Sequence, residues 1–475
     1  MDIVGRIEEQ RILLECYDSG RPEFVAIYGR RRVGKTFLVK EVFRERFAFY
    51  TTGIIDGAAN RQLKSFTDAL NEQAGTDLAT AKDWFEAFKH LKDYLALLID
   101  RQSGKRILVF LDELPWFDTK KSEFRAALDY FWNSFASDKS EIMLITCGSA
   151  ASWMVNKVIL ATGGLHNRVT RRIALKPFSI AETEQFLNLK GLRLSPYQVI
   201  EIYMVLGGIP FYLNLLSKSK SPTQNINDLC FSSDGELTRE FDILYASLFK
   251  KAERHLRIVE ALATKNKGLT RKELALLTGL YDGGTLTNLL SELELSGFIR
   301  IYTPFGKKSR GSLYQLVDFF TLFYYNFMRN HKKGDDEFWI HSLNSGKQRA
   351  WKGYAFEQVC QWHIKQIRIA LGIAGVATTI SSWRSSGSDS GAQVDLVIDR
   401  NDGIINLCEV KYSDSQYTIT KEYDRNLRNK VAAFVSETKT RKAVHTIFIT
   451  VYGLARNEYA ANVQFDITAE DLIKE

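Results

Sequence analysis

Short apolar runs alternate with segments of helical spacing in the first half of the chain. Three of these runs lie at Phe24–Gly29, Arg106–Phe117 and Glu141–Ala150. Continuous apolar runs are typical of strands buried on both faces of a parallel sheet. The segment Thr36–Phe47 between two of them has apolar residues at helical spacing. This alternation predicts an α/β fold with a parallel sheet.

The pattern changes after residue 250. Three segments of helical spacing follow one another, and Thr270 with Glu273 forms a capping-box pattern at the start of the second. Two strand-like segments then flank the basic stretch FGKKSRG at 305–311. Three helices followed by a basic hairpin predict a winged helix.

A different α/β pattern occupies the last part of the chain. An amphipathic helix at 351–367 carries Glu357, and two strands follow at Ala392–Asp399 and Ile404–Tyr412. Asn401–Gly403 between these strands is typical of a hairpin turn. We expect a second sheet here.

Composition and length limit the class of protein. The chain has 475 residues, of which 45% are hydrophobic and 25% charged, which is ordinary for a globular protein and excludes disordered and collagen-like classes. Its five cysteines have no metal-ligand spacing, and the first residues lack a secretion signal. No apolar run reaches the roughly 20 residues that a membrane helix needs. We therefore expect a soluble, cytoplasmic protein.

The positive charge is concentrated in the middle of the chain. Residues 250–350 contain 17 Lys and Arg against 10 Asp and Glu, which gives +7 of the net +8. This excess suggests a polyanion such as DNA as a partner. A solvated basic surface would give the same composition.

The sequence GRRRVGKT after the first apolar run matches the phosphate-binding loop pattern G-x-x-x-x-G-K-[ST]. In such a loop, backbone N–H groups and a helix N-terminus surround the phosphates of a nucleotide. We expect Lys35 to reach the β- and γ-phosphates and Thr36 to bind Mg²⁺. The residues expected to bind ATP here are Gly29, Arg30, Arg31, Arg32, Val33, Gly34, Lys35, Thr36 and Phe37.

Two acidic residues end the second apolar run. Ligands of parallel sheets bind at the carboxyl ends of the strands. We expect Asp112 to hold Mg²⁺ and Glu113 to polarise the water that attacks the γ-phosphate. The end of the third run, Thr146–Ser149, either places a polar side chain near that phosphate or is simply a strand end built of small residues.

Three arginines follow the third run, namely Arg168, Arg171 and Arg172. An arginine that reaches the γ-phosphate stabilises the charge of the transition state, either within one chain or from a neighbouring subunit. The same arginines would also suit an exposed surface.

These motifs occur in a fixed order, which is IVGRIEEQ, GRRRVGKT, FLDELPW, TCGSA, NRVTRRIALKPFS and GGIPFYL. Together they resemble the archaeal-type ATPase family, in the signalling branch of the AAA+-like P-loop ATPases, over about residues 1–250. The resemblance implies a helical lid over the nucleotide. It implies that Arg168 is the catalytic arginine finger, although Asn167 stands where the family has glycine. It further implies that the adenosine part of ATP lies near Val4, Gly5, Arg6, Ile209 and Pro210.

The predicted winged helix has two interpretations. In the first, the helix that begins near Thr285 enters the DNA major groove and Lys307, Lys308 and Arg310 contact phosphates. That helix, however, carries Glu292 and Glu294 and no lysine or arginine. In the second interpretation the module is a hinge between domains, as the resemblance also implies.

Charged residues interrupt the two C-terminal strands. Asp395 and Glu409 would form an oxygen-rich Mg²⁺ site across the hairpin, and Lys411 would orient the attacking water. The pattern resembles the PD-(D/E)XK restriction-endonuclease-like superfamily over about residues 350–475, with Val394 in place of the usual proline. The resemblance implies that Glu357 is a further metal ligand. The alternative is a binding module that has lost its cleavage chemistry.

The sequence thus predicts a P-loop NTPase core (1–172), a helical lid (173–249), a winged helix (250–335) and a nuclease-like α/β domain (345–475). We expect an ATP-hydrolysing switch that needs Mg²⁺, acts on DNA and forms homo-oligomers, with metal-dependent deoxyribonuclease activity as an added prospect. The alternative is a nucleotide-dependent regulatory or scaffolding protein with an inactive nuclease-like module.

Overall fold

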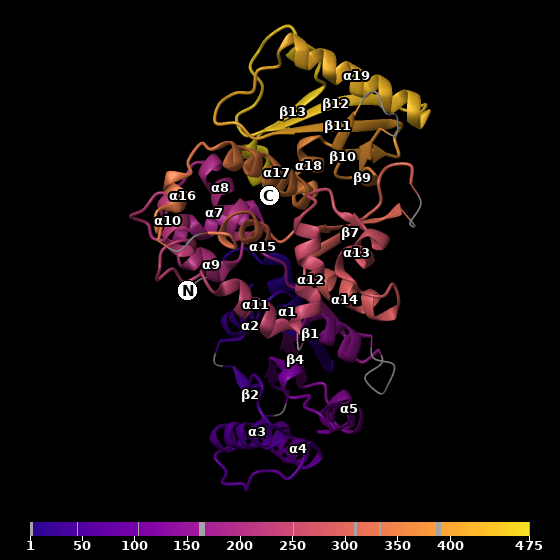
Figure 1. Cartoon of the computed structure of the whole chain (residues 1–475). Helices are drawn as coiled ribbons and strands as arrows, with labels where there is room; N and C mark the ends of the chain where they lie inside the picture. Colours follow the sequence, from indigo (N-terminus) through magenta and orange to yellow (C-terminus); the bar gives the residue numbers. More distant parts are fainter. Residues whose placement is uncertain are drawn as a thin grey trace. The chain divides into compact units, whose positions relative to one another are not determined.

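The computed structural model describes residues 3–44, 46–102, 104–160, 167–249, 251–307, 311–331, 334–385 and 391–474 (Figure 1). The chain divides into two compact units, Met1–Pro177 and Phe178–Glu475. The segments predicted as winged helix and nuclease-like domain fall in the second unit, and so does the predicted lid from residue 178 onward.

A parallel five-stranded sheet forms the centre of the first unit. Its strands are β1 (Glu23–Tyr28), β2 (Phe47–Thr52), β3 (Ile107–Asp112), β4 (Ile142–Gly148) and β5 (Arg171–Ala174). Their order is β2-β3-β4-β1-β5, and every neighbouring pair is parallel. The three apolar runs form β1, β3 and β4, and β3 and β4 are buried along their whole length. The predicted α/β fold with a parallel sheet is therefore confirmed.

Helices connect these strands. The helices are α1 (Ile7–Asp18), α2 (Lys35–Phe43), α3 (Ala59–Ala74), α4 (Trp84–Arg101), α5 (Phe124–Ser134) and α6 (Ala151–Met154), with the short helical turns η1 (Leu114–Trp116), η2 (Ala136–Asp138) and η3 (Val155–Ile159). The side chain of Asp83 caps α4 by accepting from the Glu86 N–H. Trp84 of this helix packs on Phe124 of α5 with ring centroids 4.8 Å apart. Aromatic packing of this kind fixes the two helices against each other.

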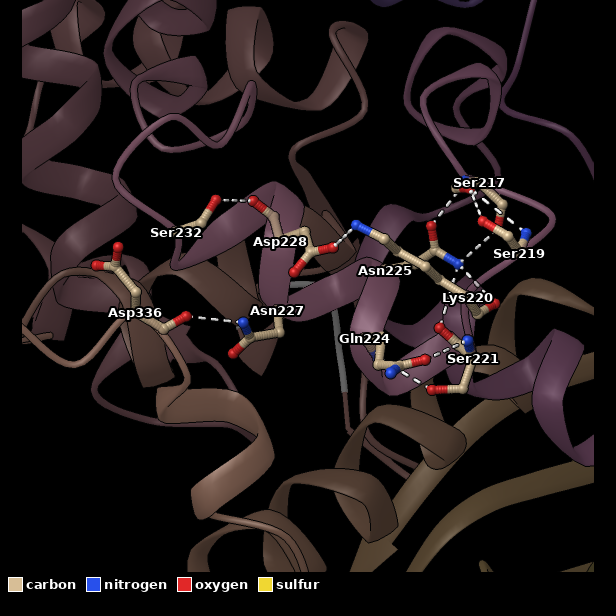
Figure 2. Close-up of polar contacts among 10 residues, drawn as sticks. All are labelled: Ser217, Ser219, Lys220, Ser221, Gln224, Asn225, Asn227, Asp228, Ser232 and Asp336. Carbon is tan, nitrogen blue, oxygen red and sulfur yellow. Dashed lines mark hydrogen bonds and ion pairs between the residues drawn. The ribbon is translucent and has the colours of Figure 1, made fainter.

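The second unit begins with five helices. They are α7 (Ile180–Leu189), α8 (Pro196–Leu206), α9 (Pro210–Asn214), α10 (Pro222–Cys230) and α11 (Glu240–Leu248). Figure 2 shows the polar contacts that hold α10, where Ser221 and Gln224 form a capping box. In the same view, the Asn225 amide group donates to the Ser217 carbonyl oxygen at 3.0 Å, and Asn227 donates to the Asp336 carbonyl oxygen at 2.7 Å. Side chains of α10 therefore fix the loop before the helix and a segment about 110 residues later.

Three helices and a small antiparallel sheet follow. They are α12 (Ala252–Ala263), α13 (Arg271–Thr278) and α14 (Gly284–Leu295), with β6 (Leu269–Thr270), β7 (Ile299–Tyr302) and β8 (Leu313–Leu316) in the order β6-β8-β7. The predicted capping box of Thr270 and Glu273 is confirmed at the start of α13. Three short helical segments then lead to the C-terminal part, namely α15 (Phe319–Phe323), η5 (Tyr324–Met328) and α16 (Phe338–His341).

A mixed five-stranded sheet forms the C-terminal part. Its strands are β9 (Thr378–Arg384), β10 (Gln393–Arg400), β11 (Ile404–Lys411), β12 (Ala443–Thr450) and β13 (Phe465–Ile467), in the order β13-β12-β11-β10-β9. The β9–β10 and β10–β11 pairs are antiparallel, and β12 and β13 continue the sheet in parallel. The accompanying helices are α17 (Gly346–Trp362), α18 (Ile364–Ala370), α19 (Lys421–Thr438) and α20 (Ala469–Ile473), with the turn η6 (Ala460–Asn462). The predicted hairpin of two strands is β10–β11.

Side chains join the first helices of the second unit to its C-terminal part. The Lys352 ammonium group lies 2.6 Å from the Glu201 carboxylate, and neither side chain is exposed. Tyr197 of α8 stacks on Tyr412, the residue after β11, at 5.0 Å between ring centroids. These contacts explain why the second half of the chain is one compact unit. Among the described residues, no helix has the length and apolarity to cross a membrane.

Candidate functional site

The phosphate-binding loop lies between β1 and α2 in the first unit. Gly29 has φ 151°, and an added Cβ there would lie 2.2 Å from the Leu175 carbonyl oxygen, so only glycine fits. Arg32 and Gly34 both have positive φ, at 72° and 89°. A loop of this conformation turns its N–H groups inward, as an anion-binding nest requires. Phe37 is exposed and Arg31 is half-buried, whereas Arg30 and Val33 are buried.

Lys35 is buried in this loop, with 4% of its surface exposed. Its ammonium group donates to the carbonyl oxygens of Gly29 at 3.2 Å and Arg30 at 3.1 Å. It also donates to the Ser149 hydroxyl at 2.9 Å. Burial lowers the pKa of Lys35, while the nearby carboxylate of Glu113 acts in the opposite sense.

Thr36 and Asp112 lie side by side below the loop. The Thr36 hydroxyl donates to the Asp112 carboxylate at 2.8 Å. Asp112 also accepts from the Glu113 N–H and from the Cys147 thiol. Burial raises the pKa of Asp112. A hydroxyl and a carboxylate next to a phosphate-binding loop are oxygen donors of the kind that Mg²⁺ prefers, so these residues fit the predicted metal.

Ser149 connects the loop to Glu113. Its N–H and hydroxyl both donate to the Glu113 carboxylate, at 3.1 and 2.5 Å. Strand β4 lies between β1 and β3 in the sheet, so the residue after β4 faces both the loop after β1 and the acidic pair after β3. This order brings Lys35, Glu113 and Ser149 together at the carboxyl edge of the sheet. Glu113 itself has φ 46°, a conformation rarely adopted by residues other than glycine.

The N-terminal segment predicted near the adenine reaches the same loop. Val4, Gly5 and Arg6 are all buried, and the Arg6 guanidinium donates to the Val33 carbonyl oxygen at 3.4 Å. The Gln10 side chain donates to the Gly5 carbonyl oxygen at 2.7 Å. This segment therefore closes one side of the phosphate-binding loop.

The three arginines lie on or just before the edge strand β5. Arg168, Arg171 and Arg172 are all exposed. The Arg171 guanidinium donates to the Thr170 carbonyl oxygen at 2.9 Å. Arg168 follows Asn167, which has φ 57°, a conformation that residues other than glycine rarely adopt.

Ile209 and Pro210 begin α9 in the second unit. Ile209 is fully buried, and Pro210 occupies the first position of the helix, where its missing N–H costs no hydrogen bond. The preceding Gly208 has φ 66°, and an added Cβ would lie 2.3 Å from the Phe178 carbonyl oxygen. Their contact with the nucleotide stays a prediction.

The C-terminal carboxylates also gather near one another. Continuing the β10–β11 register by one residue pairs Asp395 with Glu409. Burial and then Asp395 raise the pKa of Glu357 to about 8, and the charges of Lys411 and Lys267 act against this rise. Gln393 donates to the Asp395 carboxylate. The structure thus brings the predicted carboxylates to one face of the sheet.

Glu409 has partners that the sequence did not indicate. The Lys430 ammonium group of α19 donates to its carboxylate at 2.5 Å, and the Tyr423 hydroxyl donates at 2.8 Å. Lys411 lies farther away, at 4.0 Å. Lys430 is one of several charges on a helix, so nothing in the sequence pattern marks it. The Lys430 ammonium group neutralises the negative charge of Glu409, which a bound metal ion would otherwise balance.

Within the described part of the chain, no three His, Cys, Asp or Glu side chains are arranged to hold a metal ion. In the C-terminal sheet, the Glu409 carboxylate is instead paired with the Lys430 ammonium group. The donor set of Asp395, Glu409 and Glu357, as it stands, does not fit a divalent metal. Their metal and catalytic roles stay predictions.

The predicted DNA contacts are only partly described. Lys307 is exposed, whereas Lys308 and Arg310 lie outside the described residues. Glu292 of α14 pairs with the buried His255 of α12 at 2.6 Å. One of the two acidic residues of the predicted recognition helix therefore serves packing within the three helices.

Residues 3–216 match the family described as an ATPase domain predominantly from Archaea. The matched stretch contains the phosphate-binding loop, Asp112, Glu113 and Ser149. Over these residues the chain is therefore similar to archaeal-type ATPase domains.

The chain is also similar to an uncharacterized protein, MJECL04, of Methanocaldococcus jannaschii. The two are 26% identical over 437 residues, which cover 90% of this chain and 91% of the relative.

Among solved structures, the Walker-type ATPase PABY2304 of Pyrococcus abyssi matches with a TM-score of 0.45 and 18% identity, over 68% of this chain and 95% of that one. The ORC2 protein of Aeropyrum pernix, in ADPNP and ADP complexes, matches with a TM-score of 0.42 and 15% identity, over 67% of this chain and 91% of that one.

Proposed function

We propose that the chain binds ATP in the loop Gly29–Thr36 and hydrolyses it. The observation that carries this proposal is the bridge of Ser149 between Lys35 and Glu113, which puts a phosphate-binding cation and a carboxylate base at one edge of the sheet. The match to an ATPase family supports it.

Each side chain has a defined task in this proposal. Lys35 exchanges its two carbonyl partners for phosphate oxygens when ATP enters the loop. Ser149 holds the Glu113 carboxylate in place, and Glu113 accepts a proton from the attacking water. Thr36 and Asp112 would hold Mg²⁺, which offsets the negative charge of the phosphates. Arg6 packs the N-terminal segment against the loop.

Two substitutions test the site. Lys35→Ala removes the buried cation, so ATP binding falls below detection. Glu113→Gln keeps the shape but cannot accept a proton, so ATP still binds and the rate of phosphate release falls by about 10²–10⁴-fold. Lys120→Ala, at an exposed lysine of the same unit, is the control. Wild-type binding and phosphate release by Lys35→Ala would overturn the proposal.

The exposure of Arg168 supports an arginine finger that acts on a neighbouring subunit of a homo-oligomer. Mixing Glu113→Gln with Arg168→Ala tests this, because each variant would supply the residue that the other lacks. Phosphate release by the mixture should exceed that of either variant alone. Equal rates would rule out a finger supplied in trans.

For the second unit we favour a nucleic-acid-binding module without cleavage, whose position responds to ATP through the helices α7–α11. The three helices and hairpin at 252–316 would be a winged helix, used as a hinge or as a DNA contact. The pairing of Glu409 with Lys430 is the observation that favours binding over cleavage.

A DNA-cleavage assay separates the two candidates for the C-terminal part. The full chain is incubated with DNA and Mg²⁺ or Mn²⁺, with and without ATP. We expect intact DNA, with Asp395→Ala and Lys411→Ala indistinguishable from wild type. Cleavage that both variants lose would instead establish a metal-dependent deoxyribonuclease.

A further inference from the structure

A cavity of about 500 Å³ lies in the second unit. One wall comes from the β6–β8–β7 region and includes Lys267, Arg300 and Tyr302. The facing wall comes from α17 and the first two strands of the C-terminal sheet, and includes Glu357 and Asp395. A volume of this size is within the range of small-molecule sites.

Arg300 is a cation without a carboxylate partner at this cavity. Its guanidinium donates to the Gln315 side-chain oxygen at 2.9 Å through Nε, and again through Nη2. Gln315 is buried and is fixed in turn by donating to the Asn266 carbonyl oxygen at 2.6 Å. No carboxylate among the described residues forms an ion pair with Arg300. A guanidinium positioned by a neutral amide keeps its charge available for a ligand.

The charges around Arg300 favour an anion. Burial lowers the pKa of Arg300 to about 10, so the side chain stays a cation near pH 7. Lys267 lies on the same wall and is exposed, and its charge reaches Glu357 across the cavity. Glu357 and Asp395 are the two carboxylates among the described lining residues, and the cations of the lining outnumber them. Arg349 and Arg384 add further positive charge to the lining.

Aromatic rings stand beside the cations. The Arg300 guanidinium lies 5.3 Å from the centre of the Tyr302 ring. The hydroxyl groups of Tyr302 and Tyr354 donate to the carbonyl oxygens of Lys267 at 2.6 Å and Asn266 at 3.2 Å, which fixes both rings. Rigid rings next to arginine and lysine provide a surface on which a base stacks while its phosphate is bound.

We propose that this cavity binds one nucleotide unit, with Arg300 and Lys267 on its phosphate and Tyr302 beside its base. The unit is either a free nucleoside monophosphate or one nucleotide of a nucleic-acid strand. This site is separate from the ATP site, and it depends neither on ATP hydrolysis nor on DNA cleavage.

Calorimetric titration of the full chain without divalent metal tests the site. The probes are thymidine 5′-monophosphate, a hexathymidylate strand and thymidine, which has no phosphate. We expect thymidine not to bind. Binding of the monophosphate identifies a free nucleotide as the ligand, whereas binding of the strand alone identifies a nucleotide within a chain.

Arg300→Gln keeps a side-chain amide next to Gln315 and removes the charge. It should weaken binding of the phosphate-bearing probe at least about tenfold, because a hydrogen bond to a charged group is lost. Arg254→Gln, at an exposed arginine of the same region, should bind as wild type. Lys267→Gln provides a second test at an exposed position, and it decides the matter where Arg300→Gln does not fold.

Three results would overturn the proposal. The first is that neither phosphate-bearing probe binds, and the second is that thymidine binds as tightly as its monophosphate. The third is that Arg254→Gln and the two cavity variants bind the phosphate-bearing probe with equal affinity. Lys35→Ala distinguishes the two sites, because it should abolish ATP binding and leave binding of the phosphate-bearing probe at the cavity unchanged. Arg300→Gln should weaken binding at the cavity and leave ATP binding unchanged, so failure at one site is distinguishable from failure at the other.

Discussion

At the scale of single residues, burial determines which charges are usable. Lys35 is buried without a directly paired carboxylate. Its three ammonium N–H groups donate to two carbonyl oxygens and one hydroxyl. Glu409 is buried as well, but Lys430 neutralises it. A buried cation satisfied only by neutral groups can exchange them for an anionic ligand, whereas a buried ion pair is costly to separate. This difference separates the ATP site from the C-terminal carboxylates.

Burial also determines the charge of His363, and through it the pH dependence of the protein's stability. Its Nε2 accepts from the Ile180 N–H at 3.0 Å, its Nδ1 donates to the Val359 carbonyl oxygen at 2.7 Å, and burial lowers its pKa to about 4. The neutral ring therefore contributes stability that is complete above about pH 6.5 and is lost as the pH falls towards 4.

We predict that protonation of His363 lowers the free energy of unfolding of the wild type by about 3 kcal/mol between pH 7 and pH 4. His363→Gln lacks this titration, so its stability should fall less over the same range. Urea unfolding of the full chain at both pH values measures the difference. The same pH dependence in both proteins would contradict the assignment.

At the scale of elements, Phe305 holds the loop between β7 and β8 against the C-terminal sheet. The Phe305 N–H donates to the Ser382 carbonyl oxygen of β9 at 2.7 Å, and the Phe305 ring packs on Phe434 of α19 at 5.1 Å. Phe305 joins the cluster of buried side chains in the C-terminal sheet. The hairpin therefore packs on the C-terminal sheet in addition to carrying basic residues.

Phe305→Ala should lower the free energy of unfolding by about 2 kcal/mol, because a half-buried ring is lost from this cluster. Lys307→Ala, two residues away and exposed, should have no measurable effect. Thermal unfolding of the two variants makes the comparison. Equal stability would mean that the hairpin does not depend on this contact.

At the scale of the whole molecule, residues 178–475 form one unit although their sequence changes character twice. Tyr197 with Tyr412, and Lys352 with Glu201, join the helices after Phe178 to the C-terminal sheet. Buried contacts between segments of this kind couple their unfolding.

We predict that a fragment of residues 178–475 folds alone and unfolds in a single transition. Fragments 178–344 and 345–475, produced separately, should melt well below it or show no cooperative transition, since the cut exposes these contacts to water. Calorimetry of the three fragments is the measurement. Two separate fragments that melt at the temperature of the whole unit would support independent domains.

The pattern along the chain determined the local structure and the residues of the candidate ATP site. The apolar runs specified β1, β3 and β4, and the loop motif and acidic pair specified Lys35, Thr36, Asp112 and Glu113, because strand burial and phosphate binding each need particular residues at fixed local spacing. Only the tertiary structure decided which side chains meet across the sheets. The strand order places Ser149 between Lys35 and Glu113, helix packing places Lys430 on Glu409, and the approach of two segments gives Arg300 a cavity. Such contacts join residues far apart in the chain, so no local pattern records them.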